Sequence, residues 1–153
     1  MIDRIIVADT SVLIALSNID QLEILKHVYQ FIYVTKEVSE EFGEDLPSWI
    51  KIEEVKDNKK IELLQLELDR GEASSIVLAI EQENSQLIID ERKGRGIARR
   101  MGIKIIGLLG VIIMAKEKGI IQNVRPILKK LEEVGFRISV NLKRKILQRT
   151  GEI

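Results

Sequence analysis

The chain has 153 residues, a size typical of one domain with a substantial core, and its 24 basic and 24 acidic side chains cancel. A balanced total charge gives no global field toward nucleic acid or membrane, so such a partner would have to meet a local patch. The absence of cysteine excludes disulfides, thiolate zinc sites and cysteine nucleophiles, and the one histidine, His27, argues against a histidine-based site. Because His27 falls in a helical pattern, we interpret it as a surface or boundary residue.

The sequence predicts a cytoplasmic protein with no membrane partner. Its longest uncharged stretch, residues 105–115, is far below the roughly 20 residues that span a bilayer. The first apolar run contains charged residues, which is not typical of a secretory signal.

The stretch from Arg4 to Leu16 joins an aliphatic run to one acid and two hydroxyls. Residues 5–8 predict a strand of a parallel sheet that is covered on both faces. Asp9 follows at the carboxyl end of this strand, the edge where ligands and catalytic groups gather in open α/β sheets. Thr10 and Ser11 can cap the following helix, and the alternative that Asp9 is itself only an N-cap stays open.

Further elements alternate along the next part of the chain. The apolar spacing predicts a helix over 17–28, a short buried strand over 31–34 and a helix over 36–42 that Thr35 can cap. Residues 50–55 alternate as in an exposed edge strand.

The predicted helix over 36–42 contains three acids, Glu37, Glu40 and Glu41. One of them could face the same sheet edge as Asp9. Three acids on such a helix are also typical of a solvated face that the helix dipole favours, so both interpretations are kept.

A second acid follows a later buried strand. Residues 58–68 predict an amphipathic helix, and a second helix over 71–82 carries Glu72 in its first turn, where the dipole alone would favour an acid. Residues 86–89 then predict a strand that runs directly into Asp90. Two strands that each end in an aspartate predict a shared acidic site at one edge of the sheet.

The segment after Asp90 is the most concentrated basic patch. Arg92, Arg95 and Arg99 are spaced to share one helical face, with Lys93 beside it. Such cations would hold phosphate groups next to an acidic site, whereas the plain alternative is a solvated helix.

The rest of the chain predicts a strand over 103–106 and helices over 108–118, 124–134 and 140–148. The βαβα alternation predicts a single α/β domain over residues 1–153, with a parallel sheet flanked by helices. Its core would cover about residues 4–121, followed by a helical segment from about 122 to 153.

If the acids converge, they predict a divalent cation site. Asp9, Asp90, Glu72 and one glutamate of the 37–41 group would repel one another and raise their pKa values unless a cation neutralised them. Carboxylates are hard oxygen ligands, so the cation expected is Mg²⁺ or Mn²⁺. Such an ion activates water and stabilises the oxygens of phosphodiester cleavage.

Four motifs together resemble a known family. The order DTS (residues 9–11), VSEEF (38–42), GEASSIVLA (71–79) and IIDERKGR (88–95) is similar to the PIN domain. The resemblance is closest to the branch of small prokaryotic PIN-like (DUF3368-type) proteins, which is related to toxin ribonucleases of toxin–antitoxin pairs. It extends from about residue 5 to about residue 121, and the closing helical segment also resembles that branch.

The resemblance implies a layered α/β fold and Mg²⁺- or Mn²⁺-dependent hydrolysis of RNA. It implies catalytic acids at Asp9, Glu41, Glu72 and Asp90, of which Asp9, Glu72 and Asp90 would bind metal. Ser11, with Thr10, would support the metal pocket. It also implies an antitoxin partner and a homodimer. Glu72 departs from the family, since many members have aspartate there.

Two functions remain as alternatives. One is a metal-dependent endoribonuclease, the toxin component of a pair. The other is a catalytically silent nucleic-acid- or protein-binding regulatory module, whose acids are caps and whose arginines dock RNA or a partner.

Overall fold

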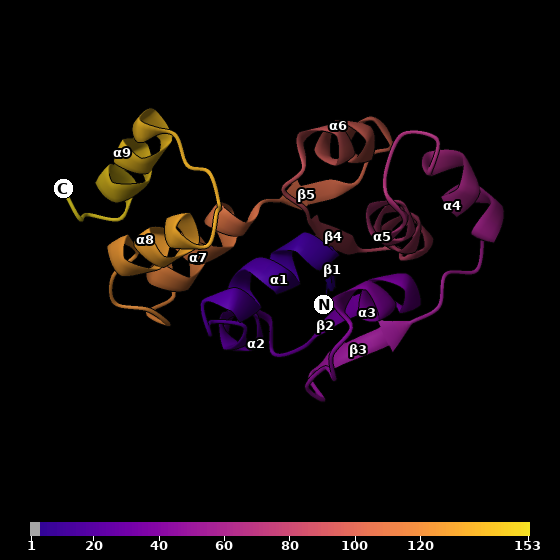
Figure 1. The fold of residues 1–153 in the computed structure, drawn as a ribbon, viewed down its shortest axis with the longest axis horizontal. Helices are drawn as coiled ribbons and strands as arrows, with labels where there is room; N and C mark the ends of the chain where they lie inside the picture. Colours follow the sequence, from indigo (N-terminus) through magenta and orange to yellow (C-terminus); the bar gives the residue numbers. More distant parts are fainter. Residues whose placement is uncertain (1–3) are drawn as a thin grey trace.

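The computed structural model describes residues 4–153, so residues 1–3 of the predicted domain lie outside the described part (Figure 1). Five strands form one parallel sheet in the order β3-β2-β1-β4-β5. Their bounds are Ile5–Ala8 for β1, Ile32–Thr35 for β2, Ile50–Glu53 for β3, Ser85–Ile88 for β4 and Lys104–Ile106 for β5. The predicted α/β fold with a parallel sheet is confirmed, and β3 lies at an edge of the sheet as its alternating pattern predicted.

Helices cover both faces of the sheet. The helices of the described residues are α1 (Thr10–Asn18), α2 (Glu23–Tyr29), α3 (Lys36–Phe42), α4 (Asn58–Leu64), α5 (Arg70–Glu81), α6 (Arg92–Arg100), α7 (Leu108–Glu117), α8 (Arg125–Glu133) and α9 (Val140–Arg149). One apolar core lies between the sheet and α1, α2 and α7, and the other lies between the sheet and α4, α5 and α6. The strands contribute to both cores in alternation, as a pleated backbone requires.

The strand β1 illustrates this alternation. Ala8 packs in the core on the α1 and α7 side, and Val7 packs in the core on the α5 side. In β4 the corresponding residues are Ile88 and Leu87, because the register pairs Ala8 with Ile88 and Val7 with Leu87. The face of the sheet to which a residue points is therefore fixed by this register.

Some predicted boundaries are wrong for identifiable reasons. The helix predicted over 17–28 is a turn followed by α2, and Asp20 in that turn has a positive φ of 56° that a helix does not contain. The helix predicted over 58–68 ends at Leu64. Thr35 caps α3 as predicted, because its hydroxyl accepts a hydrogen bond from Val38 N at 3.0 Å.

The C-terminal helices extend the core on the α7 side. Helix α8 buries Ile127, Leu128 and Leu131, and α9 buries Ile146 and Leu147. Both helices lie at one end of the molecule, and α4 lies at the other (Figure 1).

Glu152 forms hydrogen bonds with the start of α8. Its carboxylate accepts hydrogen bonds from Val124 N at 2.6 Å and from Arg125 N at 3.0 Å, and it pairs with Lys116 Nζ at 3.4 Å. These donors stand at the start of α8, where backbone N–H groups lack helical partners. Among residues 4–153, no helix is both long and apolar enough to cross a membrane.

Candidate active site

A cavity of about 400 Å³ gathers acidic side chains at the carboxyl end of β1. Its walls come from the start of α1, the end of α3, the start of α5 and the turn before α6. The residues that line it are Asp9, Thr10, Ser11, Ile14, Glu41, Asp69, Glu72 and Glu91. Five of the eight carry a carboxylate, so the cavity is strongly acidic.

Asp9 lies in this cavity as the strand pattern predicted. It stands at the N-cap position of α1, yet its side chain makes no capping hydrogen bond, so the interpretation as a simple cap is excluded. Its Oδ2 accepts a hydrogen bond from Ser11 Oγ at 3.0 Å, and its Oδ1 is buried without a hydrogen-bond partner. Burial raises the pKa of Asp9 from 3.8 to about 6.

Glu72 enters the same cavity from the first turn of α5. Only 5 % of the residue is exposed, and its Oε2 is a second buried oxygen without a hydrogen-bond partner. Burial raises the pKa of Glu72 from 4.5 to about 8, and the nearby charges of Asp69 and Asp9 add to the rise. Asp9 and Glu72 are thus two buried carboxyls whose ionised forms a nearby cation would stabilise.

Glu41 is the glutamate of the 37–41 group that lines the cavity. Its Oε1 accepts a hydrogen bond from Thr10 Oγ1 at 2.6 Å. Thr10 and Ser11 therefore do not cap α1 as predicted, because their hydroxyls are directed to Glu41 and Asp9.

The two rival glutamates of α3 have another neighbour. Glu37 Oε2 lies 4.0 Å from Arg70 Nη2, and Glu40 Oε1 lies 3.4 Å from Arg70 Nη1. Neither lines the acidic cavity. Both acids instead form ion pairs at the start of α5.

Two glycines make room for the cavity carboxylates. A Cβ atom at Gly71 would lie 2.0 Å from Glu41 Oε1, and a Cβ atom at Gly94 would lie 3.1 Å from Glu72 Oε2. Real Cβ contacts are longer than the first of these distances, so a side chain at position 71 would displace Glu41. Gly71 therefore leaves room for Glu41. Gly94 leaves room for Ile89 Cδ1, which a Cβ atom would meet at 2.8 Å, as well as for Glu72.

Asp69 and Glu91 are cavity residues that sequence reasoning missed. Asp69 Oδ1 accepts a hydrogen bond from Glu72 N at 2.8 Å and caps α5, and Glu91 Oε2 accepts one from Gly94 N at 2.8 Å and caps α6. The Gly94 hydrogen bond lowers the pKa of Glu91. The sequence did contain a signal for a capping role, since each acid directly precedes its helix. A cap position does not show that a cavity lies beside it, so the sequence did not indicate a place in the site.

Asp90 does not line this cavity. The register pairs Ala8 with Ile88, so Asp9 is level with Ile89, and Asp90 comes one residue later. In the alternation of this strand Asp90 falls on the same side as Ile88, whose side chain packs on the α7 side. Asp90 Oδ1 accepts a hydrogen bond from Leu108 N at 2.9 Å and thus caps α7. Burial raises the pKa of Asp90, while the Leu108 hydrogen bond and the charge of Arg95 oppose the rise.

The predicted basic residues divide into two groups. Arg92, Lys93 and Arg99 are exposed on α6 and make no ion pair within residues 4–153. Arg95 is half-buried, and its Nη1 donates a hydrogen bond to Ile89 O at 3.0 Å. Arg95 therefore stabilises the turn at the end of β4 and is less available to a ligand.

The cavity fits a hard divalent cation by its chemistry. All of its charged groups are carboxylates, and Asp9 Oδ1 and Glu72 Oε2 are buried oxygens with no hydrogen bond to satisfy them. Within the described range, no three acidic or histidine side chains are placed to hold one ion together. Two carboxylates suffice for Mg²⁺, which commonly keeps several waters and binds through one or two carboxylates.

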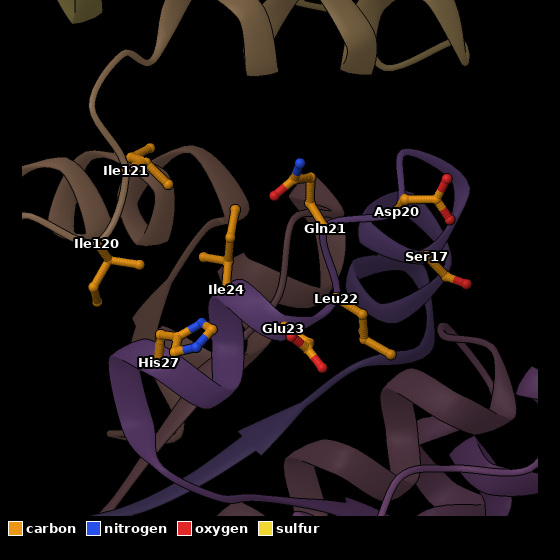
Figure 2. A pocket seen from close by; sticks show the side chains of 9 residues that line it. All are labelled: Ser17, Asp20, Gln21, Leu22, Glu23, Ile24, His27, Ile120 and Ile121. Carbon is orange, nitrogen blue, oxygen red and sulfur yellow. The ribbon is translucent and has the colours of Figure 1, made fainter.

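A second cavity of about 450 Å³ has a different character. It lies beside the turn before α2, with Ile120 and Ile121 on one side and Ser17 and Asp20 on the other (Figure 2). His27 also lines it, and this histidine is exposed as the sequence predicted. No group of buried charges converges there, so the acidic cavity is the better candidate for chemistry.

The acidic cavity lies at the carboxyl edge of a parallel sheet, which is where open α/β folds bind their ligands. A family model described as DUF3368: PIN domain matches residues 5–152. The chain therefore belongs to the PIN domain family, whose members are generally nucleases and typically use divalent metal ions. Neither the curated proteins nor the solved structures contain a match to this chain.

Proposed function

We propose that this protein is a Mg²⁺- or Mn²⁺-dependent endoribonuclease that hydrolyses phosphodiester bonds of single-stranded RNA in the acidic cavity. The observation that carries the proposal is the pair of buried, unpartnered oxygens, Asp9 Oδ1 and Glu72 Oε2, in one cavity. A buried carboxylate oxygen without a partner costs free energy, which a bound cation would offset.

The proposal assigns different roles to the cavity residues. Asp9 and Glu72 would hold the ion, and Ser11 fixes the orientation of Asp9 through its hydrogen bond. Glu41, which Thr10 holds by a hydrogen bond, would orient a water molecule for attack on phosphorus. When bound, the ion supplies charge stabilisation at the phosphate oxygens and activates water.

Helix α6 supplies the nearest candidates for RNA contacts. It begins directly after the cavity residue Glu91, and Arg92, Lys93 and Arg99 are exposed along it. Cations at such positions hold phosphate groups and set the register of the substrate. Asp90, which the family resemblance assigns to the metal, would act here as the cap of α7 that fixes the neighbouring turn.

The proposal extends to a biological role as the toxin of a cytoplasmic toxin–antitoxin pair. Its support is the family relationship together with the open cavity, whose rim includes the 42 % exposed Ile14 as an apolar contact for a covering antitoxin. Induced expression of the wild type should arrest bacterial growth, and Asp9→Asn should relieve the arrest. Arrest by both proteins would contradict the toxin role of this cavity.

A silent regulatory module is the second candidate. It is favoured by the three acids that cap helices, since Asp69, Glu91 and Asp90 each accept a backbone N–H. Such a module would bind RNA or protein without cleaving it. It gives no account of the two unpartnered oxygens of Asp9 and Glu72.

Cleavage of a mixed single-stranded RNA by purified protein tests the proposal. We expect cleavage with Mn²⁺, none with EDTA, and loss in Asp9→Asn and Glu72→Gln. Asp57→Asn is the matched control, because Asp57 caps α4 through Lys60 N and does not line the cavity. Absence of cleavage by wild type that demonstrably binds Mn²⁺ would overturn the nuclease and favour the silent module.

A further inference from the structure

The balanced total charge conceals a strong division along the chain. Residues 92–153 contain 16 of the 24 basic side chains and four of the 24 acidic ones, a net charge of +12. Residues 1–91 contain the other eight basic and 20 acidic side chains, a net charge of −12. The acidic part includes all eight residues that line the cavity, so a polyanionic substrate is repelled by the residues proposed to cleave it.

The positive charge continues well beyond α6. Residues 122–153 carry eight basic and three acidic side chains. This segment forms α8 and α9, which lie together at one end of the molecule (Figure 1). This part of the positive charge is therefore grouped at one end of the molecule, whereas the cations of α6 lie beside the acidic cavity.

Five cations of this segment are exposed and unpaired. They have no ion pair or hydrogen bond among the described residues, and we call them the basic end: Lys129, Lys130, Arg137, Arg144 and Lys145. Two of the three acids of the segment are engaged, since Glu132 pairs with Lys143 and Glu152 pairs with Lys116, and Glu133 is exposed without an ion pair among the described residues. One unpaired acid against five unpaired cations leaves the basic end strongly positive among the described residues.

Packing keeps these cations on the outside. Helix α8 turns its apolar residues 127, 128 and 131 into the core and leaves Lys129 and Lys130 exposed. Helix α9 buries residues 146 and 147 and leaves Arg144 and Lys145 exposed. Both helices therefore combine a buried apolar side with exposed cations.

We propose that the basic end binds the phosphate backbone of single-stranded RNA and anchors it away from the acidic cavity. The choice of RNA rests on the proposed function, but the binding itself requires neither metal nor cleavage. The acidic part of a second copy, residues 1–91, is the less favoured occupant of the basic end, because several of its acids already form ion pairs. Glu37 and Glu40 pair with Arg70, Glu54 pairs with Lys36, and Asp57 pairs with Lys60. Phosphates of RNA carry regular, unpaired charge that suits cations spread over two helices.

Binding of a short fluorescein-labelled oligouridylate, measured by anisotropy in EDTA over a range of salt concentrations, tests this surface. EDTA removes the metal, so the outcome is independent of whether the protein cleaves RNA. The variant combines Lys129→Gln, Lys130→Gln, Arg144→Gln and Lys145→Gln. The control removes four exposed lysines of the acidic part: Lys26→Gln, Lys51→Gln, Lys56→Gln and Lys59→Gln.

Both variants change the net charge equally and alter only exposed residues, so thermal unfolding should show that both fold. We expect the first variant to bind roughly tenfold or more weakly at low salt, and its slope of log K against log salt to fall by about 2 to 3, since each phosphate contact on a single strand contributes about 0.7. The control should keep the wild-type slope. An equal loss in both variants, an unchanged slope in the first, or salt-sensitive self-association of wild type without RNA binding would overturn the proposal.

Discussion

Thr10 donates a hydrogen bond to Glu41 across 31 positions of sequence, with its Oγ1 2.6 Å from Glu41 Oε1. Gly71 lies against both groups, because a Cβ atom there would be 2.0 Å from Glu41 Oε1 and 2.8 Å from Thr10 Oγ1. Residues of α1, α3 and α5 thus fix one carboxylate at the cavity. The close approach requires a residue without a side chain at position 71.

Gly71→Ala should therefore damage the cavity more than the fold. The added methyl group would displace the Glu41 carboxylate and break its hydrogen bond to Thr10, while alanine is the better helix former by about 0.5–1 kcal/mol. We expect a melting temperature near that of wild type and at least a tenfold loss of RNA cleavage. The rate of cleavage and thermal unfolding, measured on the same sample, check this.

Gly96→Ala is the matched control for that variant. The nearest atom to a Cβ at Gly96 is Arg100 Nη2 at 3.9 Å, so α6 accepts the methyl group without a clash. Full activity with a small gain in stability is expected. Equal activity of the two variants would show that the position of Glu41 does not matter.

The raised pKa values of Asp9 and Glu72 predict how stability changes with pH in metal-free protein. Folding raises the pKa of Asp9 from 3.8 to about 6 and that of Glu72 from 4.5 to about 8. As pH rises, the two carboxyls lose their protons in the unfolded chain before they do so in the folded protein. The stabilisation present at low pH is therefore lost as pH rises through the raised pKa values of Asp9 and Glu72. For Asp9 alone the loss is about 3 kcal/mol.

Thermal unfolding in EDTA should accordingly show a lower melting temperature at pH 8 than at pH 4, a range that contains the windows of both groups, and Mg²⁺ or Mn²⁺ should reduce the difference. Asp9→Asn cannot ionise at this position, so its melting temperature should fall less over the same range. The same decline in wild type and Asp9→Asn would mean that Asp9 is not the group responsible.

Asp90 is predicted to act mainly through α7. Asp90→Ala removes the acceptor for Leu108 N and should lower the free energy of unfolding by about 1–2 kcal/mol. Asp90→Asn keeps an acceptor and should retain most of that stability. Denaturant unfolding measures both values. The geometry also predicts that Asp90→Asn weakens Mn²⁺ binding less than Asp9→Asn, and the reverse order would place Asp90 at the metal.

Glu152 should stabilise the start of α8. Glu152→Ala leaves Val124 N and Arg125 N without their acceptor and should cost about 1–2 kcal/mol. Burial opposes ionisation of Glu152, but the hydrogen bonds and Lys116 outweigh it and lower its pKa. This stabilisation is present above the ordinary pKa and is lost as pH falls through the lowered one. Melting curves of wild type and variant should therefore converge in acid, and a constant difference would contradict this role.

The sequence predicted the parallel α/β sheet well because its strands are continuous apolar runs. It also placed Asp9, Glu41 and Glu72 at positions that the structure brings into one cavity. Asp90 differs because the side of the sheet to which a residue points depends on the strand register, and a shift of one residue separates it from Asp9. Register is set by pairing between distant segments, which one strand pattern does not contain.

Other parts of the site were hidden for a related reason. Asp69 interrupts an apolar pattern, which predicts a helix boundary at this position. The structure shows that Asp69 does cap α5. Its place in the cavity depends on how α5 packs beside β1. The hydroxyl of Thr10 is interpreted from sequence as a cap because its acceptor, Glu41, lies 31 positions away and reaches it only in the folded protein. The acceptor of Ser11 is the neighbouring Asp9, a local pair that the helix-cap interpretation overlooked.

Calorimetric titration of Mn²⁺ into the wild-type protein near pH 7 tests most directly the claim that Asp9 and Glu72 form a cation site. Because Glu72 has a pKa of about 8 without metal, binding should release close to one proton per ion, visible as a dependence of the binding enthalpy on the buffer. Asp9→Asn and Glu72→Gln should each abolish or strongly weaken the binding. If Mn²⁺ does not bind, or binds equally to both variants, the acidic cavity is not the metal site.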